Sequence, residues 1–326
     1  MKSLENSICI SIVAPVYNEE ASLSPLLQRL QIVSSGLEHR YDFEFIFIDD
    51  GSQDSSLNVA KELCKSEPRL RVVELRRNYG QTAALQAGLD AAGGEIIISM
   101  DADLQHFPEN IPSFLEKIEQ GCDVVCGWRH QRQEGLTRQW PSRVANLLIR
   151  KISGLTIHDI GTTFRAYRRE IVKDILLLGE HHRFVPVFAS VAGARIDEVP
   201  IDNIVRPHGA SSYGIGRTLN VFIDLFFLVF FTKYLDRPIR IFGKLAIISF
   251  GIGSVISLYL SYVWISTGLA VVREHSGLFT IGIIFYLASV QFITSGVVAE
   301  LLSRMYFGGP DRSSYKIRNV WGGTLT

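Results

Sequence analysis

The sequence predicts an α/β fold, in which a doubly wound sheet domain is followed by interfacial helices and two transmembrane helices. Three observations predict it. Short β-branched apolar runs alternate with helical patterns in the first 130 residues, charges are concentrated in the first 240 residues, and two long uncharged runs follow. The 326 residues suffice for one large domain or two smaller ones. The formal net charge of zero gives no indication of a nucleic-acid-binding surface.

The apolar runs and the helical patterns succeed one another in a regular order. Strands are expected at residues 8–14, 43–48, 70–75, 95–100 and 123–127, and helices at residues 21–33, 55–64, 81–92 and 111–120. Because parallel strands need crossover connections, this alternation predicts a parallel sheet with helices on both faces. In such sheets, ligands bind outside the carboxyl ends of the strands.

Polar residues follow three of these expected strands. Residues 15–19 follow the first strand, Asp49 and Asp50 follow the second, and Asp101 and Asp103 follow the fourth. Two carboxylates separated by one residue can reach one hard divalent cation, which keeps open positions for phosphate oxygens and neutralises a departing diphosphate. The alternative is structural, with Asp103 capping a helix and Asp101 lying in a turn.

Other phosphate-binding signatures are missing from the sequence. A dinucleotide-binding domain needs Gly-x-Gly-x-x-Gly after its first strand, but residues 15–20 read PVYNEE, and no Walker-type loop occurs. Gly251 and Gly253 lie in a long apolar run and indicate helix packing instead. The four cysteines are too few and too scattered for a disulfide framework, and Cys122 and Cys126 are expected to be buried packing residues.

Two uncharged runs near the C-terminus predict membrane-spanning helices. They cover residues 245–272 and 275–299, and the second continues through Leu302. Each can cross a hydrocarbon core of roughly 30 Å. Basic residues flank the pair on its outer sides, and no signal-peptide pattern precedes the first strand, so the N-terminal domain and both termini are expected in the cytoplasm. The competing interpretation is an apolar hairpin in the core of a soluble protein.

The segment before the first expected span is also apolar. Residues 221–231 are too short to span, so they predict an interfacial helix, followed by a basic stretch that can meet anionic lipid. A buried helix of the soluble domain is the alternative. The expected boundaries are 1–215 for the sheet domain, 216–242 for the interfacial helices, 243–307 for the transmembrane hairpin and 308–326 for a cytoplasmic tail.

Several motifs together resemble a known family of enzymes. They are residues 13–20 (VAPVYNEE), 48–55 (IDDGSQDS), 76–81 (RRNYGQ), 100–105 (MDADLQ), 159–169 (DIGTTFRAYRR) and 206–213 (RPHGASSY). With the two spans, they resemble inverting family-2 glycosyltransferases of the GT-A fold. Among these, the polyprenyl-phosphate glycosyltransferases are most similar: bactoprenol glucosyltransferases, the aminoarabinose transferases of lipid A modification, and dolichyl-phosphate mannose or glucose synthases. The resemblance covers nearly the whole chain.

The resemblance implies a role for individual residues. Asp101 and Asp103 would hold Mg²⁺ or Mn²⁺, and catalysis would involve Asp159 as general base, Asp103 and Arg165. The residues expected to bind the nucleotide sugar are Pro15, Val16, Tyr17, Glu19, Asp49, Asp50, Gln81, Asp101 and Ala102. The residues expected around the acceptor phosphate are Arg129, Arg132, Arg138, Arg165, Arg206, Ser212 and Tyr213. The implied partners are UDP-glucose, undecaprenyl phosphate, the membrane, and further copies of the chain in a tetramer by analogy.

Acceptor chemistry qualifies the role of Asp159. A phosphate monoester has a second pKa of about 6 and is largely dianionic near neutrality, so it needs no strong base. We therefore expect Asp159 to orient an arginine such as Arg165, or to take a residual proton. Residues 128–143 are expected to form a phosphate-binding lid, with a solvated loop as the alternative.

The identity of the reaction has alternatives. The sugar rests on analogy alone, so aminoarabinose, mannose and galactose stay open beside glucose. A processive polysaccharide synthase is a second enzyme class, but Arg138, Gln139 and Trp140 only faintly match its acceptor motif, and two spans make a poor channel. A membrane scaffold without catalysis is the non-enzymatic alternative, against which the intact acidic motifs count.

Overall fold

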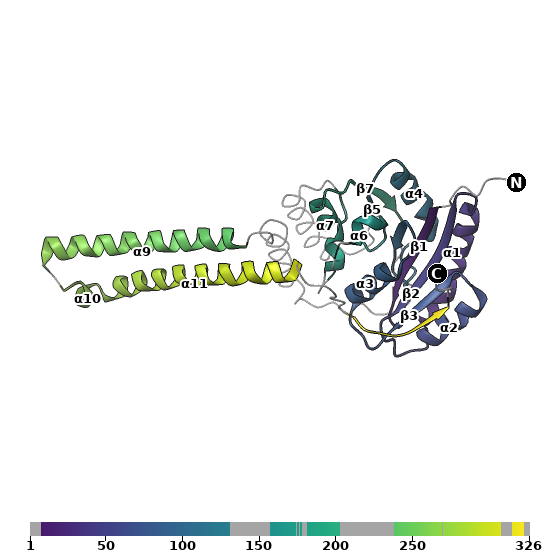
Figure 1. Ribbon diagram of the computed structural model, residues 1–326, viewed down its shortest axis with the longest axis horizontal. Coiled ribbons are helices and arrows are strands. Elements are labelled where there is room, and N and C mark those ends of the chain that lie inside the picture. The colour runs from purple at the N-terminus through teal and green to yellow at the C-terminus, as the bar shows by residue number, and fades with distance from the viewer. Residues whose placement is uncertain are drawn as a thin grey trace. The chain divides into compact units, whose positions relative to one another are not determined.

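The computed structural model describes residues 8–130, 157–173, 175, 177, 181–202, 238–268, 270–307 and 315–322. The chain divides into two compact units (Figure 1). Unit 1 comprises Met1–Leu225 together with Ser313–Thr326, and unit 2 comprises Phe226–Arg312. Residues on both sides of unit 2 in the sequence therefore belong to the same folded body.

An eight-stranded sheet with the order β7-β5-β6-β4-β1-β2-β3-β8 forms the centre of unit 1, counted over the described residues. Its strands are β1 (Ile8–Val16), β2 (Tyr41–Asp49), β3 (Leu70–Leu75), β4 (Ile96–Ser99), β5 (Val124–Arg129), β6 (Arg165–Arg168), β7 (Ile196–Ile201) and β8 (Ile317–Gly322). β1 to β4 run parallel, and β5 runs parallel to β7. β6 and β8, which were not among the five expected strands, run antiparallel to their neighbours, so the sheet is mixed, while the five expected strands run parallel to one another as predicted.

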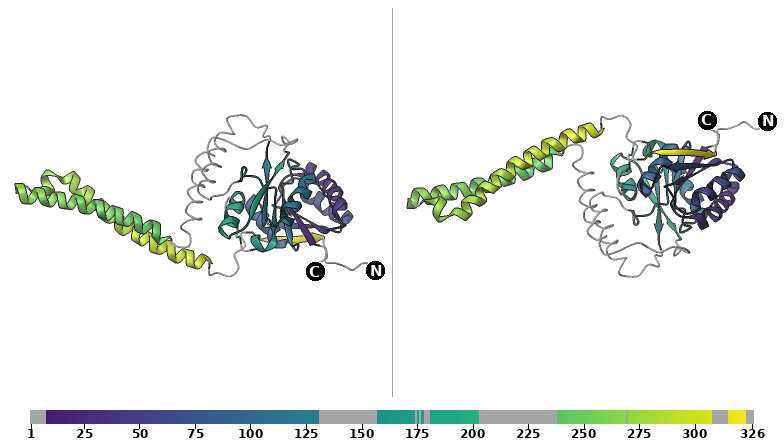
Figure 2. Two further views of the ribbon diagram at one scale, coloured as in Figure 1. Left: turned by 90° about the horizontal axis from the view of Figure 1, so that it is seen from above. Right: turned by 90° about the horizontal axis from the view of Figure 1, so that it is seen from below.

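Helices lie on both faces of the sheet, as expected for a doubly wound domain (Figure 2). They are α1 (Glu20–Leu37), α2 (Ser56–Ser66), α3 (Gln81–Ala91), η1 (Pro108–Asn110), α4 (Ile111–Glu119), α6 (Arg169–Val172), η2 (His181–Phe184) and α7 (Val185–Val191). The predicted strands and helices up to residue 129 are confirmed, with ends that shift by a few residues.

The side-chain alternation of the strands divides the core between the two faces. Ile10, Ile12 and Ala14 of β1 pack in one cluster with the buried residues of α1 and α4. Val13 points the other way, toward α3, where a Cβ atom added to Gly88 would lie 2.2 Å from its Cγ1 atom. Gly88 thus lets α3 lie close to the sheet. Gln81, the first residue of α3, follows the carboxyl end of β3 through residues 76–80.

Unit 2 contains two long antiparallel helices, α9 (Ile239–Thr267) and α11 (Ser276–Phe307), joined through the short α10 (Val271–Glu274). The 29 residues of α9 correspond to a length of about 43 Å. Both helices are long and apolar enough to cross a membrane, and most of their side chains face outward. The two apolar helices expected from the sequence are confirmed, and Arg273 and Glu274, which lie between the two expected spans, fall in α10.

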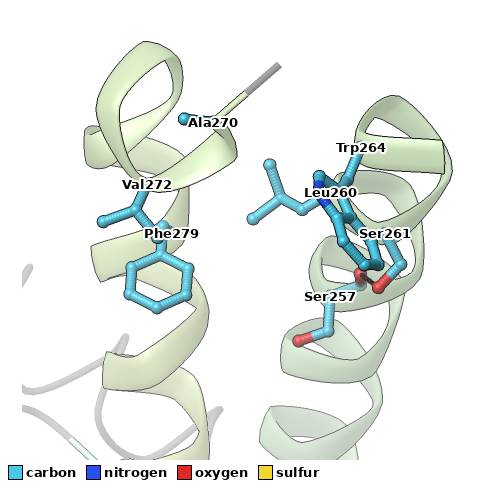
Figure 3. A pocket seen from close by; sticks show the side chains of 7 residues that line it. All are labelled: Ser257, Leu260, Ser261, Trp264, Ala270, Val272 and Phe279. Atoms are coloured by element: carbon cyan, nitrogen blue, oxygen red, sulfur yellow. Dashed lines mark hydrogen bonds between the residues drawn. The ribbon is translucent and has the colours of Figure 1, made fainter. Parts of the chain in front are cut away.

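Small and hydroxyl residues mediate the contact between these two helices. Gly253 lies against Gly282, and the Tyr286 hydroxyl donates to Ser254 Oγ at 3.4 Å and to Ser257 Oγ at 3.2 Å. Such pairs permit close backbone approach and hydrogen bonding within an apolar medium. Toward the α10 end, an open pocket is lined by Ser257, Leu260, Ser261, Trp264, Ala270, Val272 and Phe279 (Figure 3).

Candidate active site

The turn after β2 places a buried carboxylate at the carboxyl edge of the sheet. Asp50 is 3% exposed, and its two oxygens accept hydrogen bonds from the backbone N–H groups of Tyr79 and Gly80 at 2.7 and 2.8 Å. Burial raises the pKa of Asp50, and the two N–H groups offset part of that effect. Gly51 follows with a φ of +70°, and a Cβ atom there would lie 2.6 Å from the carbonyl carbon of Arg77. The loop between β3 and α3 therefore packs directly on this turn.

The turn after β1 is joined to the same region. The Asn18 N–H donates to Ser52 Oγ at 3.1 Å, and Asn18 Oδ1 accepts from the Gln53 N–H at 2.8 Å. The Glu19 N–H donates to Ser56 Oγ at 2.7 Å. Asn18 has a φ of +56°, a left-handed conformation that asparagine tolerates well. These bonds hold the turn after β1 against the turn after β2.

The other residues expected to bind the nucleotide also lie at this edge. Pro15 and Val16 are the last residues of β1, and the Tyr17 side chain that follows is 42% exposed. Asp49 ends β2 and is buried, which raises its pKa. One Asp49 oxygen accepts from the Ser52 N–H at 3.3 Å, and the other has no partner among the described residues. The exposed ring of Tyr17 can therefore contact a ligand. Asp49 stabilises the turn after β2 through its hydrogen bond with Ser52.

The acidic motif after β4, residues 101–103, is hydrogen-bonded to α3 and to the segment that precedes β6. Asp101 accepts hydrogen bonds from Gln81 Nε2 at 2.7 Å and from the Thr163 hydroxyl at 2.6 Å. Ala102 and Asp103 are buried, and Asp103 accepts from the Gln105 N–H at 3.0 Å. The next helical turn begins only at Pro108, so the alternative that Asp103 caps a helix is wrong.

The chemistry of this motif fits a divalent cation. Asp101 and Asp103 offer carboxylate oxygens, the ligands that Mg²⁺ and Mn²⁺ prefer. Among the residues that the structure describes, no three His, Cys, Asp or Glu side chains gather into a fuller metal cage. A cation held by two carboxylates would keep positions for phosphate oxygens and water, as the transfer of a diphosphate-linked group requires.

Asp159 forms the second part of the site with Arg129. The Arg129 guanidinium donates from Nε to Asp159 Oδ2 at 2.7 Å and from Nη2 to Oδ1 at 3.1 Å. The Asp159 side chain is 2% exposed and the Arg129 side chain 20%. The Gly161 N–H also donates to Asp159 Oδ1, at 3.2 Å. A buried carboxylate thus orients a partly exposed guanidinium through a bidentate pair.

Arg165 occupies a different position from the one expected. It is fully buried, and its guanidinium donates to the backbone carbonyls of Ile160 and His182 at 2.7 Å and of Arg183 at 3.1 Å. This placement corrects two expectations. Arg165 joins the 157–163 segment to η2 and does not face an acceptor phosphate, and the arginine that Asp159 orients is Arg129.

His106 was missed by sequence reasoning. Its side chain is buried against the Phe164 ring, and its Nδ1 atom has no partner among the described residues. Burial lowers the pKa of His106 to about 4, while the charges of Asp103 and Asp159 raise it and that of Arg129 lowers it. A neutral imidazole therefore lies within electrostatic reach of both the acidic motif and the Asp159–Arg129 pair. Its position three residues after Asp103 was the only signal in the sequence.

Five of the expected acceptor residues lie outside the described residues, as do most of the expected lid and the whole interfacial segment 221–231. The five residues are Arg132, Arg138, Arg206, Ser212 and Tyr213. These stay predictions. The described part of the site brings together Asp50, Gln81, Asp101 and Asp103 on one side and Asp159 and Arg129 on the other.

Comparisons with known proteins agree with this architecture. A model described as Glycosyl transferase family 2 matches residues 11–176. A dodecaprenyl-phosphate galacturonate synthase of Rhizobium johnstonii is 39% identical over 320 residues, which cover 97% of this chain and 94% of that protein. An undecaprenyl-phosphate 4-deoxy-4-formamido-L-arabinose transferase of Pseudomonas aeruginosa is 36% identical over 316 residues, which cover 95% of this chain and 90% of that protein.

A solved structure shows the same fold at greater distance. It is glucosyl-3-phosphoglycerate synthase from Mycobacterium tuberculosis in complex with Mn²⁺, uridine diphosphate and phosphoglyceric acid. Its TM-score is 0.53 at 20% sequence identity, and the match covers 69% of this chain and 78% of that one. Fold and site together define a glycosyltransferase of the GT-A type. The chain belongs to glycosyl transferase family 2, which confirms the family resemblance, the fold class and the enzyme class predicted from the sequence.

Proposed function

We propose that this enzyme transfers a sugar from a nucleoside diphosphate donor to a polyprenyl phosphate, with inversion at the anomeric carbon. The observation that carries the proposal is the likeness to two polyprenyl-phosphate sugar transferases along at least 95% of the chain, through the two apolar helices. Those helices give the enzyme access to a lipid acceptor. Undecaprenyl phosphate is the acceptor we expect.

On the donor side, the edge formed by the turns after β1, β2 and β4 binds the nucleotide sugar. The exposed Tyr17 ring can stack on a base, and Asp50 holds the loop that begins α3. Gln81 and Thr163 orient Asp101 by hydrogen bonds, which leaves the acidic motif prepared for a metal and a diphosphate. A Mg²⁺ or Mn²⁺ ion bound there would neutralise the charge of the departing diphosphate.

On the acceptor side, Arg129 binds the lipid phosphate, and Asp159 positions the Arg129 guanidinium. One phosphate oxygen attacks the anomeric carbon as the bond to the nucleoside diphosphate breaks, and that bond's electron pair leaves with the diphosphate. A dianionic phosphate carries no proton on the attacking oxygen, so the step does not require Asp159 as a base. The bidentate contact from Asp159 fixes the guanidinium plane instead.

The identity of the sugar changes from the one expected from the sequence. Glucose was predicted by analogy, but the relatives carry galacturonate and a formamido-arabinose in their names. We therefore place UDP-galacturonate first and UDP-4-deoxy-4-formamido-L-arabinose second, with UDP-glucose and GDP-mannose as further candidates.

The topology of the chain supports a cytoplasmic catalytic domain. β8 follows the two apolar helices in the sequence and belongs to the same unit as β1 to β7. Two crossings return the chain to its starting side, and the basic flanks favour the cytoplasm for that side. We retain the interfacial segment and a homo-oligomer, a tetramer by analogy, as parts of the proposal. Native mass spectrometry of the protein in detergent tests the assembly.

One assay tests the proposal as a whole. The full-length protein in lipid nanodiscs is incubated with undecaprenyl phosphate, Mg²⁺ or Mn²⁺, and each of the four labelled donors. We expect an acid-labile glycolipid from at least one donor, and none when undecaprenyl phosphate is omitted. If nucleoside diphosphate were released but none of the four donors gave a glycolipid, the acceptor assignment would be wrong. A ladder of longer lipid-linked products would instead indicate a processive synthase.

A further inference from the structure

The strand that follows the membrane helices is part of the catalytic sheet. β8 pairs antiparallel with β3, with Val73 opposite Val320 and Glu74 opposite Asn319 (Figure 2, the yellow strand). Sequence analysis predicted a separate tail at residues 308–326, so this pairing was missed. Without β8, β3 would be the edge strand of the sheet, with unpaired backbone groups.

Glu74 joins β8 to the body of the domain. Its buried carboxylate accepts hydrogen bonds from Asn319 Nδ2 at 3.2 Å, Trp321 Nε1 at 3.4 Å and Arg318 Nη1 at 3.4 Å. Burial raises the pKa of Glu74, but the hydrogen bonds from Asn319 and Trp321 and the charges of Lys61 and Arg318 outweigh it and lower the pKa. Lys61 also lies over the Trp321 ring, 4.2 Å from its centroid. The strand is therefore anchored by side chains as well as by backbone.

β8 also contacts the loop that leads to the donor site. The Arg76 N–H donates to the Lys316 carbonyl at 3.0 Å, and Arg318 Nη2 donates to the Arg76 carbonyl at 2.9 Å. Arg76 is the first residue of the loop between β3 and α3, whose last residues donate to Asp50. At the far end of α3, the Tyr315 hydroxyl donates to Asp90 at 2.8 Å. The segment 315–322 thus holds the start of the loop and the end of the helix that carries Gln81.

We infer that β8 is a positioning element of the donor site, which holds the 76–80 loop so that Tyr79, Gly80 and Gln81 keep their contacts with Asp50 and Asp101. This inference rests on the proposed function. Arg318 is its specific positioning residue, because it bridges Glu74 and the Arg76 carbonyl. The contacts that the structure records for β8 run to β3, α2 and Arg76 at the start of the donor loop, so we expect the effect on the donor.

Substitution of Arg318 by methionine tests the inference in the full-length protein. The Arg318 side chain is 57% exposed, so the variant should fold. We expect the KM for the nucleotide sugar to rise about three- to tenfold, as the loss of one solvent-exposed hydrogen bond of ordinary net strength predicts, with the KM for lipid phosphate within about twofold of wild type. Hydrogen exchange of residues 76–80 should accelerate, and Arg318→Lys should restore part of the affinity. Lys65→Met is the matched control, because Lys65 pairs with Glu62 within α2.

Either of two results overturns the inference: an unchanged donor KM, or equal rises in the KM of donor and acceptor. Calorimetric binding of UDP and of GDP gives a second readout that does not depend on lipid transfer. If wild type forms no glycolipid but binds a nucleotide more tightly than Arg318→Met does, the proposed acceptor fails and the inference stands. If both proteins bind the nucleotide equally, the inference fails whatever the acceptor is.

Discussion

The donor half and the acceptor half of the site are built in different ways. In the donor half, two turns, one loop and the start of α3 are held together by short hydrogen bonds around Asp50 and Asp101. In the acceptor half, the described contacts centre on Asp159, which pairs with the partly exposed guanidinium of Arg129 and accepts a hydrogen bond from the Gly161 N–H. The donor half should therefore depend on hydrogen-bond geometry, and the acceptor half on charge and orientation.

The largest effect is expected at the acidic motif of the donor half. Asp103→Asn removes a carboxylate charge from the proposed metal site and should lower the transfer rate about 10²- to 10³-fold, the range for loss of one electrostatic stabiliser. The rate is measured as labelled glycolipid formed in nanodiscs. Asp42→Asn is the control, because Asp42 lies at the amino end of β2, away from the carboxyl edge of the sheet, and it should keep the wild-type rate. A folded Asp103→Asn variant with normal activity would contradict a role in catalysis and would favour the scaffold.

The second largest effect is expected at Asp50, whose hydrogen bonds fix the geometry of the donor half. Asp50→Asn replaces one of two accepting oxygens by an amide N–H₂ that faces a backbone donor, so Tyr79 or Gly80 loses its partner. An unsatisfied buried group costs about 1–3 kcal/mol, which corresponds to a rise in the donor KM of roughly 5- to 150-fold. The KM of the lipid phosphate should stay unchanged. Parallel rises in both KM values would show that the two halves are not separable.

A charge test of the acceptor half has a smaller expected effect. Asp159→Asn keeps the shape but removes the charge that orients Arg129, and we expect kcat/KM for the lipid phosphate to fall about tenfold. The deficit should be the same from pH 6 to pH 9. If Asp159 acted as a base, the loss would be about 10²- to 10⁴-fold and would shrink as rising pH deprotonates the acceptor without help. Asp197→Asn, which removes the ion pair with Lys117, is the matched control.

What the sequence predicts differs between the two halves for a physical reason. The donor half consists of turns that directly follow apolar strands, and local patterns are strong for both, so Asp50, Asp101 and Asp103 were expected after the strands that they do follow in the structure. The partner of Asp159 depends on how β5 lies beside the 157–163 segment. No local pattern contains that information, and Arg165 was chosen although tertiary packing buries it against three carbonyls.

The strands that were missed have the same explanation. β6 is four residues long and begins and ends with arginine, β7 contains Asp197, Glu198 and Pro200, and β8 is exposed along its length. None has the apolar run of a buried central strand. Each becomes a strand because a formed sheet offers it an edge or a gap, and two of them, β6 and β8, add antiparallel pairings that the sequence did not predict.

The smallest effect concerns His106, whose pKa is influenced by charged groups of both halves. Burial lowers its pKa to about 4 from an ordinary value of 6.5. As pH falls below about 6.5, His106 binds a proton in the unfolded chain but stays neutral in the folded protein. The free energy of unfolding therefore decreases between about pH 6.5 and pH 4, and the contribution of His106 is constant below that range. In His106→Leu that part of the loss should disappear, so the Tm difference between variant and wild type should change by a few degrees over this window. Thermal unfolding of the metal-free protein measures it, with the exposed His39→Gln as control. If the Tm of His106→Leu and that of wild type changed in parallel with pH, His106 would not be held neutral in the folded protein. A charged imidazole would then act on the carboxylates of both halves of the site.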